Sequence, residues 1–175
     1  SVASNIEINR KDAAPDAAIS VDTTQFGSAI MNLVLNARDA MPDGGTISIE
    51  TSVVRSGEIV GAMSDQNPAP RRPDHELVRI EIRDTGQGMA PDVVQHAFEP
   101  FFTTKKEGAG SGMGLAMVYG FVRQSGGSIQ IQSALGAGTS VRMFLPRVHS
   151  SAARAKASRS CPPSPTSPSF EFRPG

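Results

Sequence analysis

The sequence predicts an α/β domain of two layers, in which a mixed sheet carries about three helices on one face. Several short segments alternate apolar and polar residues, which is typical of strands with one buried face. Other segments repeat apolar residues at the period of a helix. Because the two kinds of segment are interspersed along the chain, we expect the helices to pack against a sheet built from the strands.

The first half of the chain predicts two short strands followed by a helix. The strands cover residues 5–9 and 18–22, where isoleucine and valine alternate with other residues. Asp22 or Thr23 can cap the helix, which stops before Pro42. The remaining predicted elements are strands over 46–54 and 77–84, helices over 91–98 and from Gly112 to "SGG", and an antiparallel pair of strands over 128–133 and 139–146.

The chain divides into a folded domain over residues 1–148 and a tail over 149–175. The tail consists mainly of Ser, Pro, Ala and Arg, which cannot bury enough apolar surface to offset the entropy of ordering. We therefore expect a disordered tail or linker. A second region, residues 56–76, is rich in Gly, Pro and charge and predicts a long connection.

Composition excludes several classes of function. The 17 basic and 17 acidic residues balance, so nothing resembles the basic surface of a nucleic-acid-binding protein. The one cysteine, Cys161, can form neither an internal disulfide nor a structural zinc site. No apolar run reaches the roughly 18 residues of a membrane span, and no signal sequence begins the chain. We expect a cytoplasmic domain or fragment without membrane contact, whose full-length parent can still be anchored.

One acid ends a predicted strand and points toward the core. Asp84 lies two residues past Ile82 and four past Ile80, so its carboxylate shares their face, between sheet and helices. A buried carboxylate needs hydrogen-bond donors or becomes protonated. Asp84 is therefore either a turn-capping residue or an acid on the floor of a pocket. In the second case, Gly86 and Gly88 would let a planar ligand approach the backbone.

Two asparagines share one face of the first predicted helix. Asn32 and Asn36 are four residues apart, beside a stripe that is otherwise apolar. Amides are poor helix formers and need partners when they face a core. The pair either ties the helix to a loop or offers amide oxygens to Mg²⁺, which keeps most of its waters and shares phosphate oxygens.

Glycines at positions 108, 110, 112 and 114 lead into the third predicted helix. Free N–H groups at a helix N-terminus favour phosphate. The spacing is not G-x-G-x-x-G, because Met113 or Leu115 occupies the place of the third glycine, and no lysine follows to complete a P-loop. The segment is either a phosphate-binding loop or a flexible lid without a ligand.

The order of these features is more specific than any one of them. The chain has an asparagine helix, then D-x-G-x-G, then "FEPFFTTK", then glycines entering a helix, and "GAGT" before the last strand. This order resembles the catalytic and ATP-binding domain of sensor histidine kinases. These domains belong to the Bergerat-fold superfamily, with DNA gyrase, the mismatch-repair ATPases and heat-shock chaperones. The resemblance covers residues 19–146, and "NARDAMPDGG" is closest to nitrogen-regulatory and hybrid-type kinases.

The resemblance implies a site for Mg·ATP. Asp84 matches the acid that accepts a hydrogen bond from the adenine amino group, Asn36 the asparagine that coordinates Mg²⁺, and Asn32 its neighbour toward the phosphates. The other implied contacts are Gly86, Gly88 and Met89 at the base, Lys105 or its competitor Lys106 at the phosphates, Gly110, Gly112 and Gly114 in the lid, Leu115 at the triphosphate, and Thr139 in the last glycine box. The implied catalytic residues are Asn32, Asn36 and Lys105.

The resemblance also implies a reaction. The γ-phosphoryl group of ATP would move to a histidine on a separate dimerisation and phosphoacceptor domain, and a response-regulator receiver domain would act downstream. Hydrolytic relatives carry a glutamate base where this chain has Asn32, which disfavours attack by water. Asp39 occupies a position where many kinases have a basic residue, and its role stays open. The alternatives are an ATPase that drives conformational change and a non-catalytic nucleotide-binding or scaffold module.

We do not expect any histidine of this chain to be the phosphoacceptor. His75 begins "HEL", which superficially resembles an acceptor motif, but it opens the strand that leads to Asp84. His96 lies in the short helix before "FEPFF" and His149 in the tail. The acceptor domain is therefore expected to belong to another part of a longer protein.

The "FEPFF" segment allows two interpretations. Phe98, Phe101 and Phe102 either pack in the core and anchor the lid, or present a surface to the acceptor domain.

Overall fold

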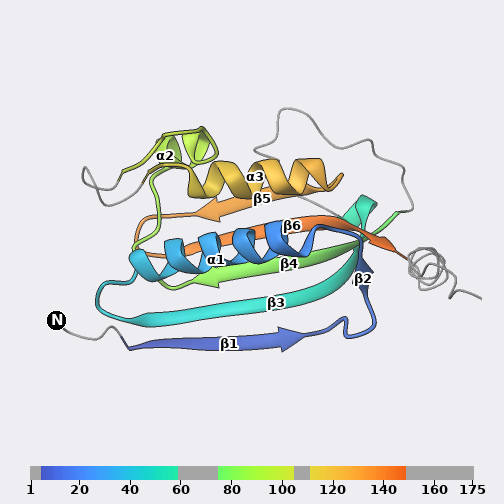
Figure 1. Ribbon diagram of the computed structural model, residues 1–175. Coiled ribbons are helices and arrows are strands. Elements are labelled where there is room, and N and C mark those ends of the chain that lie inside the picture. The colour runs from blue at the N-terminus through green and yellow to red at the C-terminus, as the bar shows by residue number, and fades with distance from the viewer. Residues whose placement is uncertain (1–4, 59–74, 105–110, 149–175) are drawn as a thin grey trace, which may run out of the picture.

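One mixed sheet carries the helices on a single face, as Figure 1 shows for the computed structural model. The structure describes residues 5–58, 75–104 and 111–148. The predicted two-layer α/β architecture is confirmed. The tail over 149–175 and most of the long connection lie outside the described residues, so the predicted domain boundary remains a prediction.

The sheet is antiparallel except at one edge. Its strands are β1 (Ile6–Asp12), β2 (Ala18–Ile19), β3 (Gly45–Arg55), β4 (Glu76–Asp84), β5 (Ser128–Ser133) and β6 (Thr139–Val148). The order is β1-β3-β4-β6-β2, with β5 also paired to β6, and only β1 and β3 run parallel. The strand predicted over residues 18–22 is present, but it is shorter than predicted. It ends at Ile19, because the chain must turn there to begin the first helix at Thr23.

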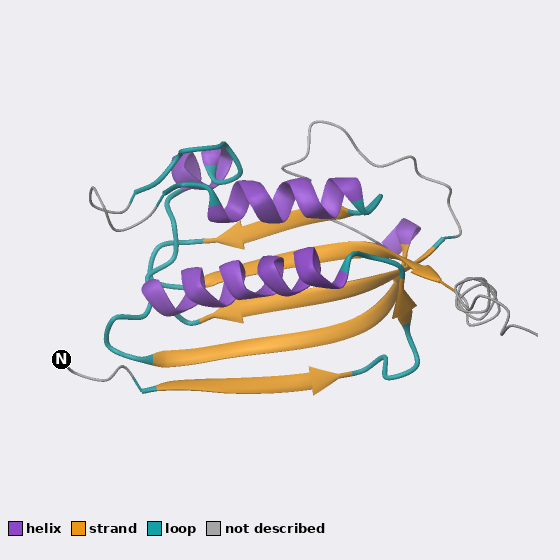
Figure 2. Cartoon of the chain, in the orientation of Figure 1, coloured by secondary structure: helices purple, strands orange, loops and turns teal. Residues whose placement is uncertain are grey.

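In the described residues, three helices cover the sheet (Figure 2): α1 (Thr23–Asp39), α2 (Pro91–His96) and α3 (Gly114–Gln124). A short 3₁₀ turn, η1 (Ser56–Glu58), follows β3. Asp22 is the N-cap of α1, and its Oδ1 accepts a hydrogen bond of 2.8 Å from the Gln25 N–H. Within the three described ranges, no helix is long and apolar enough to cross a membrane.

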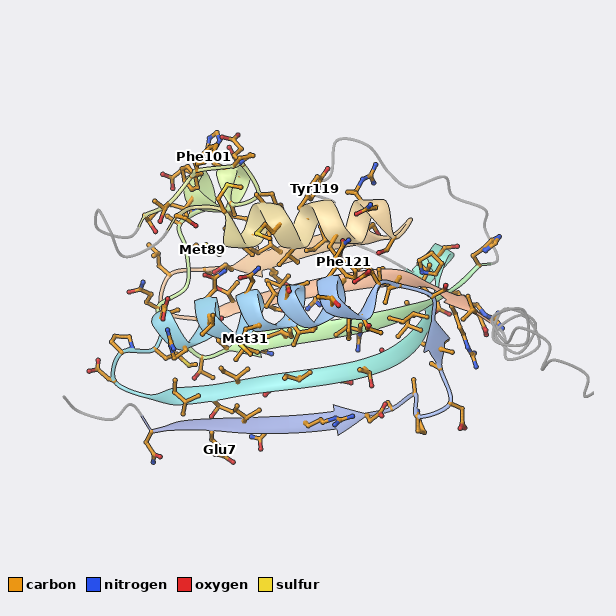
Figure 3. The ribbon with its side chains drawn as sticks, viewed as in Figure 1. Glu7, Met31, Met89, Phe101, Tyr119 and Phe121 are labelled. Atoms are coloured by element: carbon orange, nitrogen blue, oxygen red, sulfur yellow. The ribbon has the colours of Figure 1, made fainter. Side chains whose placement is uncertain are left out.

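The core lies between the sheet and the pair α1 and α3. Phe121 of α3 packs against Phe26 of α1 with ring centroids 6.1 Å apart, in the space between the two helices (Figure 3). Alternate residues of β4 point into this core, as predicted, and end with Asp84. The most deeply buried side chains are Met41, Ile47, Val118, Val122, Ile129, Met143 and Leu145. This packing fixes the relative positions of the ends of α1, α3 and β4.

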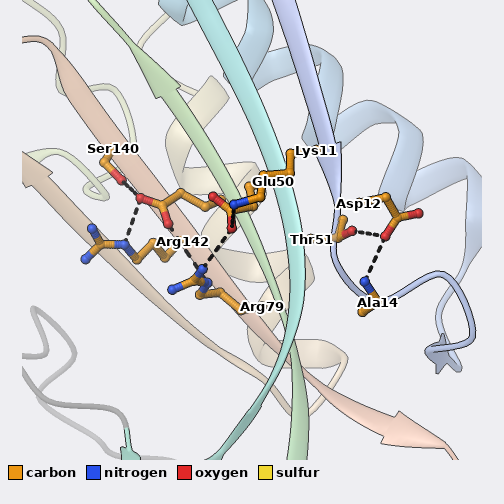
Figure 4. A network of polar contacts seen from close by, with 9 residues as sticks. Lys11, Asp12, Ala14, Glu50, Thr51, Arg79, Ser140 and Arg142 are labelled. Carbon is orange, nitrogen blue, oxygen red and sulfur yellow. Dashed lines mark hydrogen bonds and ion pairs between the residues drawn. The ribbon is translucent and has the colours of Figure 1, made fainter.

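A network of charged side chains covers the opposite face of the sheet (Figure 4). Glu81 accepts hydrogen bonds of 2.7 Å from Ser140 Oγ and 3.0 Å from Arg142 Nε. Arg79 lies between Glu81 and Glu50, at 3.9 Å and 3.6 Å. Burial acts to raise the pKa of Glu81, but the bonds from Ser140 and Arg142 outweigh it and lower that pKa. The network ties β3, β4 and β6 together on the side away from the helices.

Candidate functional site

Four segments meet at the carboxyl-terminal end of β4: the turn over 84–89, the end of α1, the beginning of α3 and the turn between β5 and β6 (Figure 1). The Gln87 N–H donates to the Ala40 carbonyl at 3.0 Å, and the Gln87 carbonyl accepts from the Gly136 N–H at 2.7 Å. The turn over 84–89 is therefore held from both sides. Its shape depends on α1 and on the turn between β5 and β6.

Asp84 is buried at the centre of this junction, with 6% of its surface exposed. Its Oδ1 accepts hydrogen bonds from the Gly86 N–H at 2.8 Å and the Thr139 N–H at 3.2 Å. Burial raises the pKa of this carboxyl above its ordinary value, while the two N–H groups act in the opposite direction. Among the described residues, no hydrogen bond to Oδ2 is found. The carboxylate thus caps its own turn and still offers one oxygen to a ligand donor.

Gly86 and Gly88 have a reason for being glycine that the sequence did not reveal. A Cβ at Gly86 would lie 2.6 Å from the Ala40 carbonyl oxygen. Gly88 has φ +67°, and a Cβ there would overlap the Ala134 carbonyl oxygen. Both glycines are required by close contact between parts of the protein itself. Their predicted role beneath a planar ligand stays a prediction.

Ser133 connects two of the predicted site residues. Its Oγ accepts from the Met89 N–H at 2.8 Å, donates to the Gly138 carbonyl at 2.9 Å and lies 2.9 Å from Thr139 Oγ1. Figure 3 shows Met89 at the end of the sheet where β4 stops. Ser133 was not among the residues predicted from the sequence. The predicted pairing of residues 128–133 with 139–146 contained the signal, because it places Ser133 opposite Thr139.

Thr85 is a second residue of the site that was not predicted from the sequence. Its hydroxyl oxygen accepts from the Thr46 N–H at 3.0 Å, and its own N–H donates to the Thr46 carbonyl at 3.2 Å. These bonds tie the turn after Asp84 to the first residues of β3. No feature of the local sequence indicated them, because the partners are 39 positions apart.

The two asparagines and the beginning of α3 lie side by side. A Cβ at Gly114 would lie 3.5 Å from Asn36 Nδ2 and 3.9 Å from Asn32 Oδ1. No side chain caps the N-terminus of α3 at Met113. Leu115, predicted at the triphosphate, is partly buried and packs against the core.

Asn32 also lines a cavity of about 180 Å³ between α1 and α3, together with Thr24, Gln25, Ser28, Ala29, Met117 and Phe121. In the described part of the chain, no three His, Cys, Asp or Glu residues cluster as a metal site. The side-chain amide oxygens of Asn32 and Asn36 are candidate ligands for a cation at the beginning of α3. This donor set suits Mg²⁺, which needs few protein ligands when phosphate and water supply the others.

Other predicted residues are placed only in part. Lys105, Lys106 and Gly110 lie outside the described residues. Gly112 is described, and its carbonyl accepts from the Phe101 N–H at 3.1 Å. Asp39, whose role the sequence left open, forms an ion pair of 2.8 Å with Arg38.

Residues 21–149 match the family described as histidine kinase-, DNA gyrase B- and HSP90-like ATPase. The chain belongs to this family. Its relatives are sensor kinases: it is 43% identical over 130 residues to the sensor kinase CckA of Brucella abortus and 34% identical over 141 residues to the sensor histidine kinase ZraS of Escherichia coli K12. These matches cover 74% and 81% of this chain, but only 13% of CckA and 25% of ZraS.

Solved structures agree with this assignment. The chain superposes on the mycobacterial sensor histidine kinase MprB with a TM-score of 0.60 and 25% identity, covering 81% of this chain and 82% of that one. It also superposes on full-length ShkA, solved in complex with AMPPNP, with a TM-score of 0.62 and 26% identity, covering 82% of this chain and 26% of ShkA. The predicted fold and family are confirmed, and family membership implies ATP as the ligand. The assignment of individual residues to ATP stays a prediction.

Proposed function

We propose that this domain binds Mg·ATP at the junction around Asp84 and transfers the γ-phosphoryl group to a histidine on a separate phosphoacceptor domain. That domain would belong to the same longer sensor protein, in the cytoplasm, and would pass the phosphoryl group to a response-regulator receiver domain. One observation supports the binding site best: Asp84 is a buried carboxylate with one oxygen held by two N–H groups and the other available.

The chemistry of the Asp84 carboxylate favours adenine as the base that binds next to it. An ionised carboxylate only accepts hydrogen bonds, so Oδ2 suits the amino group of adenine. Guanine presents a carbonyl at that position and would leave two acceptors facing each other without a proton. Oδ1 cannot turn away easily, because Gly86 and Thr139 both hold it. The carboxylate is therefore positioned before the nucleotide arrives.

The phosphate end would lie where Asn32 and Asn36 meet the beginning of α3. The free N–H groups there suit phosphate oxygens, and the amide oxygens suit a hydrated cation. Bound Mg²⁺ would supply charge neutralisation on the phosphate oxygens. Lys105 would add a positive charge at the same phosphates. Catalysis by these groups consists of positioning and charge stabilisation rather than covalent chemistry.

Asn32 favours transfer over hydrolysis. Its amide is not basic, so it cannot activate a water molecule as the glutamate of hydrolytic relatives does. An acceptor histidine supplies its own nucleophilic nitrogen and does not need such a base on this domain. Incubation of the domain with Mg·ATP alone is therefore expected to release little phosphate.

Phe101 is proposed to contact the acceptor domain. The aromatic segment divides in the structure: Phe98 packs on Tyr119 with centroids 5.5 Å apart and Phe102 on His96 at 5.6 Å, whereas Phe101 is 75% exposed. Figure 3 shows Phe101 beyond α2 on the outside of the molecule. A large exposed ring next to the proposed phosphate end is suited to recognising a partner.

Calorimetric titration with Mg·ATP and Mg·GTP tests the site. The natural chain is expected to bind ATP saturably and GTP much more weakly. Asp84→Asn is expected to lose most of this affinity, whereas Asp16→Asn, at an exposed aspartate, is expected to retain it. Equal binding by the natural chain and Asp84→Asn would contradict the site. Steady phosphate release would indicate an ATPase, and ATP binding without transfer to any added acceptor domain would indicate a scaffold.

A further inference from the structure

Ser133 occupies the centre of a hydrogen-bond network behind the proposed base site. Ser133 and Thr139 are directly opposite each other on β5 and β6, and both point toward the helices, as Asp84 does. The Thr139 N–H also bonds to Asp84, so the residue whose hydroxyl contacts Ser133 is held directly at the carboxylate. The network therefore joins three strands at the proposed ligand.

The positions of the two hydroxyl protons follow from the partners. The Gly138 carbonyl has no proton, so Ser133 must donate its only proton in the bond of 2.9 Å between them. The Met89 N–H already donates to Ser133 Oγ. The remaining contact of 2.9 Å, between Ser133 Oγ and Thr139 Oγ1, is then a bond that Thr139 donates. The Thr139 proton thus points at Ser133, and only lone pairs remain for a ligand.

We propose that Ser133 is a positioning residue that determines nucleotide specificity, by holding the Thr139 hydroxyl with its proton turned away from the base. The pocket then offers acceptors alone, Asp84 Oδ2 and Thr139 Oγ1, to the edge of the base. This arrangement rests on the proposed ATP site. It favours a base with an amino group at its 6-position and disfavours one with a carbonyl oxygen there.

Inosine triphosphate is the direct probe, because inosine has a carbonyl oxygen where adenine has its amino group. The measurement is the ratio of the dissociation constants for Mg·ITP and Mg·ATP, by calorimetry, in the natural chain and in Ser133→Ala. Ser128→Ala is the matched control, since Ser128 is a buried serine at the other end of the same strand.

In Ser133→Ala, the Thr139 hydroxyl is free to rotate and to donate to a carbonyl oxygen. ATP is expected to bind about fivefold more weakly, which corresponds to the loss of roughly one hydrogen bond. ITP is expected to keep its affinity or to gain, so the ratio falls by about fivefold or more. Ser128→Ala is expected to keep the natural ratio. In a Thr139→Val background, adding Ser133→Ala is expected to leave the ratio unchanged, because no hydroxyl remains to be redirected.

Three results would decide against the inference. If Ser133→Ala weakens ATP and ITP by the same factor, Ser133 only supports the structure and does not determine specificity. An unchanged affinity for both nucleotides would also overturn it. If the natural chain binds neither nucleotide, the proposed function itself fails and takes this inference with it. If Ser133→Ala does not fold, Ser133→Cys replaces it, because cysteine has a similar volume and a weaker hydrogen-bonding group. The ratio of the dissociation constants for ITP and ATP is then measured in that variant, and an unchanged ratio would contradict the proposal.

Discussion

The Thr139 N–H donates a hydrogen bond to Asp84 Oδ1 across 55 positions of the sequence. This bond joins the end of β4 to the beginning of β6, two strands that are also paired through their length. The same oxygen also accepts a hydrogen bond from the Gly86 N–H. The acid of the proposed base site is thus oriented by the sheet and by the turn before β6, not by its own turn alone.

The affinity for ATP is expected to fall as the pH is lowered. The adenine amino group needs the ionised carboxylate, and burial raises the pKa of Asp84 above its ordinary 3.8. Protonation therefore begins at a higher pH than for an exposed aspartate. Titrations at falling pH, from about pH 7 toward the ordinary aspartate value of 3.8, measure the effect, and Asp84→Asn is the control that removes it.

The contribution of Asp84 to the stability of the fold is expected to change with pH in the opposite direction to the ATP affinity: it increases as the pH is lowered. A carboxyl whose folded-state pKa is raised favours folding most when it is protonated, and this contribution is lost as the pH rises through the raised pKa. Acidification is therefore expected to lower the affinity for ATP while the contribution of Asp84 itself to stability increases. An ATP affinity that stays constant as the pH is lowered to 3.8 would contradict the role of Asp84.

Asn36→Ala is expected to remove most of the Mg²⁺ dependence of ATP binding. The natural chain is expected to bind ATP about tenfold more tightly in the presence of Mg²⁺ than in the presence of a chelator, because the chelator removes the interaction between Mg²⁺ and the Asn36 side chain. The comparison of the two conditions in each variant measures this. Asn9→Ala, at an exposed strand position, is expected to keep the full dependence. If Asn36→Ala keeps it as well, the cation is held elsewhere.

Gly88→Ala and Gly120→Ala are expected to change stability in opposite directions. At Gly88 the φ of +67° is unfavourable for alanine and the added Cβ would overlap the Ala134 carbonyl, so a loss of about 3 kcal/mol is expected. Gly120 lies within α3 with nothing within 4 Å of an added Cβ, so alanine is expected to stabilise by about 0.5–1 kcal/mol. Chemical denaturation of both variants provides the free energies. A stable Gly88→Ala would show that the turn can rearrange.

Phe101→Gly is expected to be more stable than Phe101→Ala by about 0.5–1 kcal/mol. Phe101 is the one residue other than glycine in the described ranges with a positive φ, at 67°. Glycine relieves a strain of about 1–2 kcal/mol but adds chain entropy worth about 0.5–1 kcal/mol to the unfolded state. Thermal unfolding of the two variants gives the comparison. Both variants are expected to bind ATP normally and to transfer phosphate poorly to an added acceptor domain, and normal transfer would remove Phe101 from the proposed partner surface.

Much of the site could be predicted because it depends on local periodicity. The alternation along β4 required Asp84 to point toward the core, and the spacing of four placed Asn32 and Asn36 on one helix face. The cap at Asp22 and the antiparallel pairing of the last two strands follow from short segments in the same way. Covalent geometry repeats from residue to residue, so patterns of this kind can be read without knowing the fold.

The tertiary structure decided the contacts that the order of the strands creates. It showed that Gly86 and Gly88 pack against Ala40 and Ala134, that Ser133 joins Met89 to Thr139, and that β2 is only two residues long. It also separated exposed Phe101 from its packed neighbours. The sequence by itself determined the family, the strand and helix faces and the identity of the acid and the amides. Which backbone groups hold that acid was decided only when β4 and β6 became neighbours, because a hydrogen bond across 55 positions depends on topology and not on any local preference.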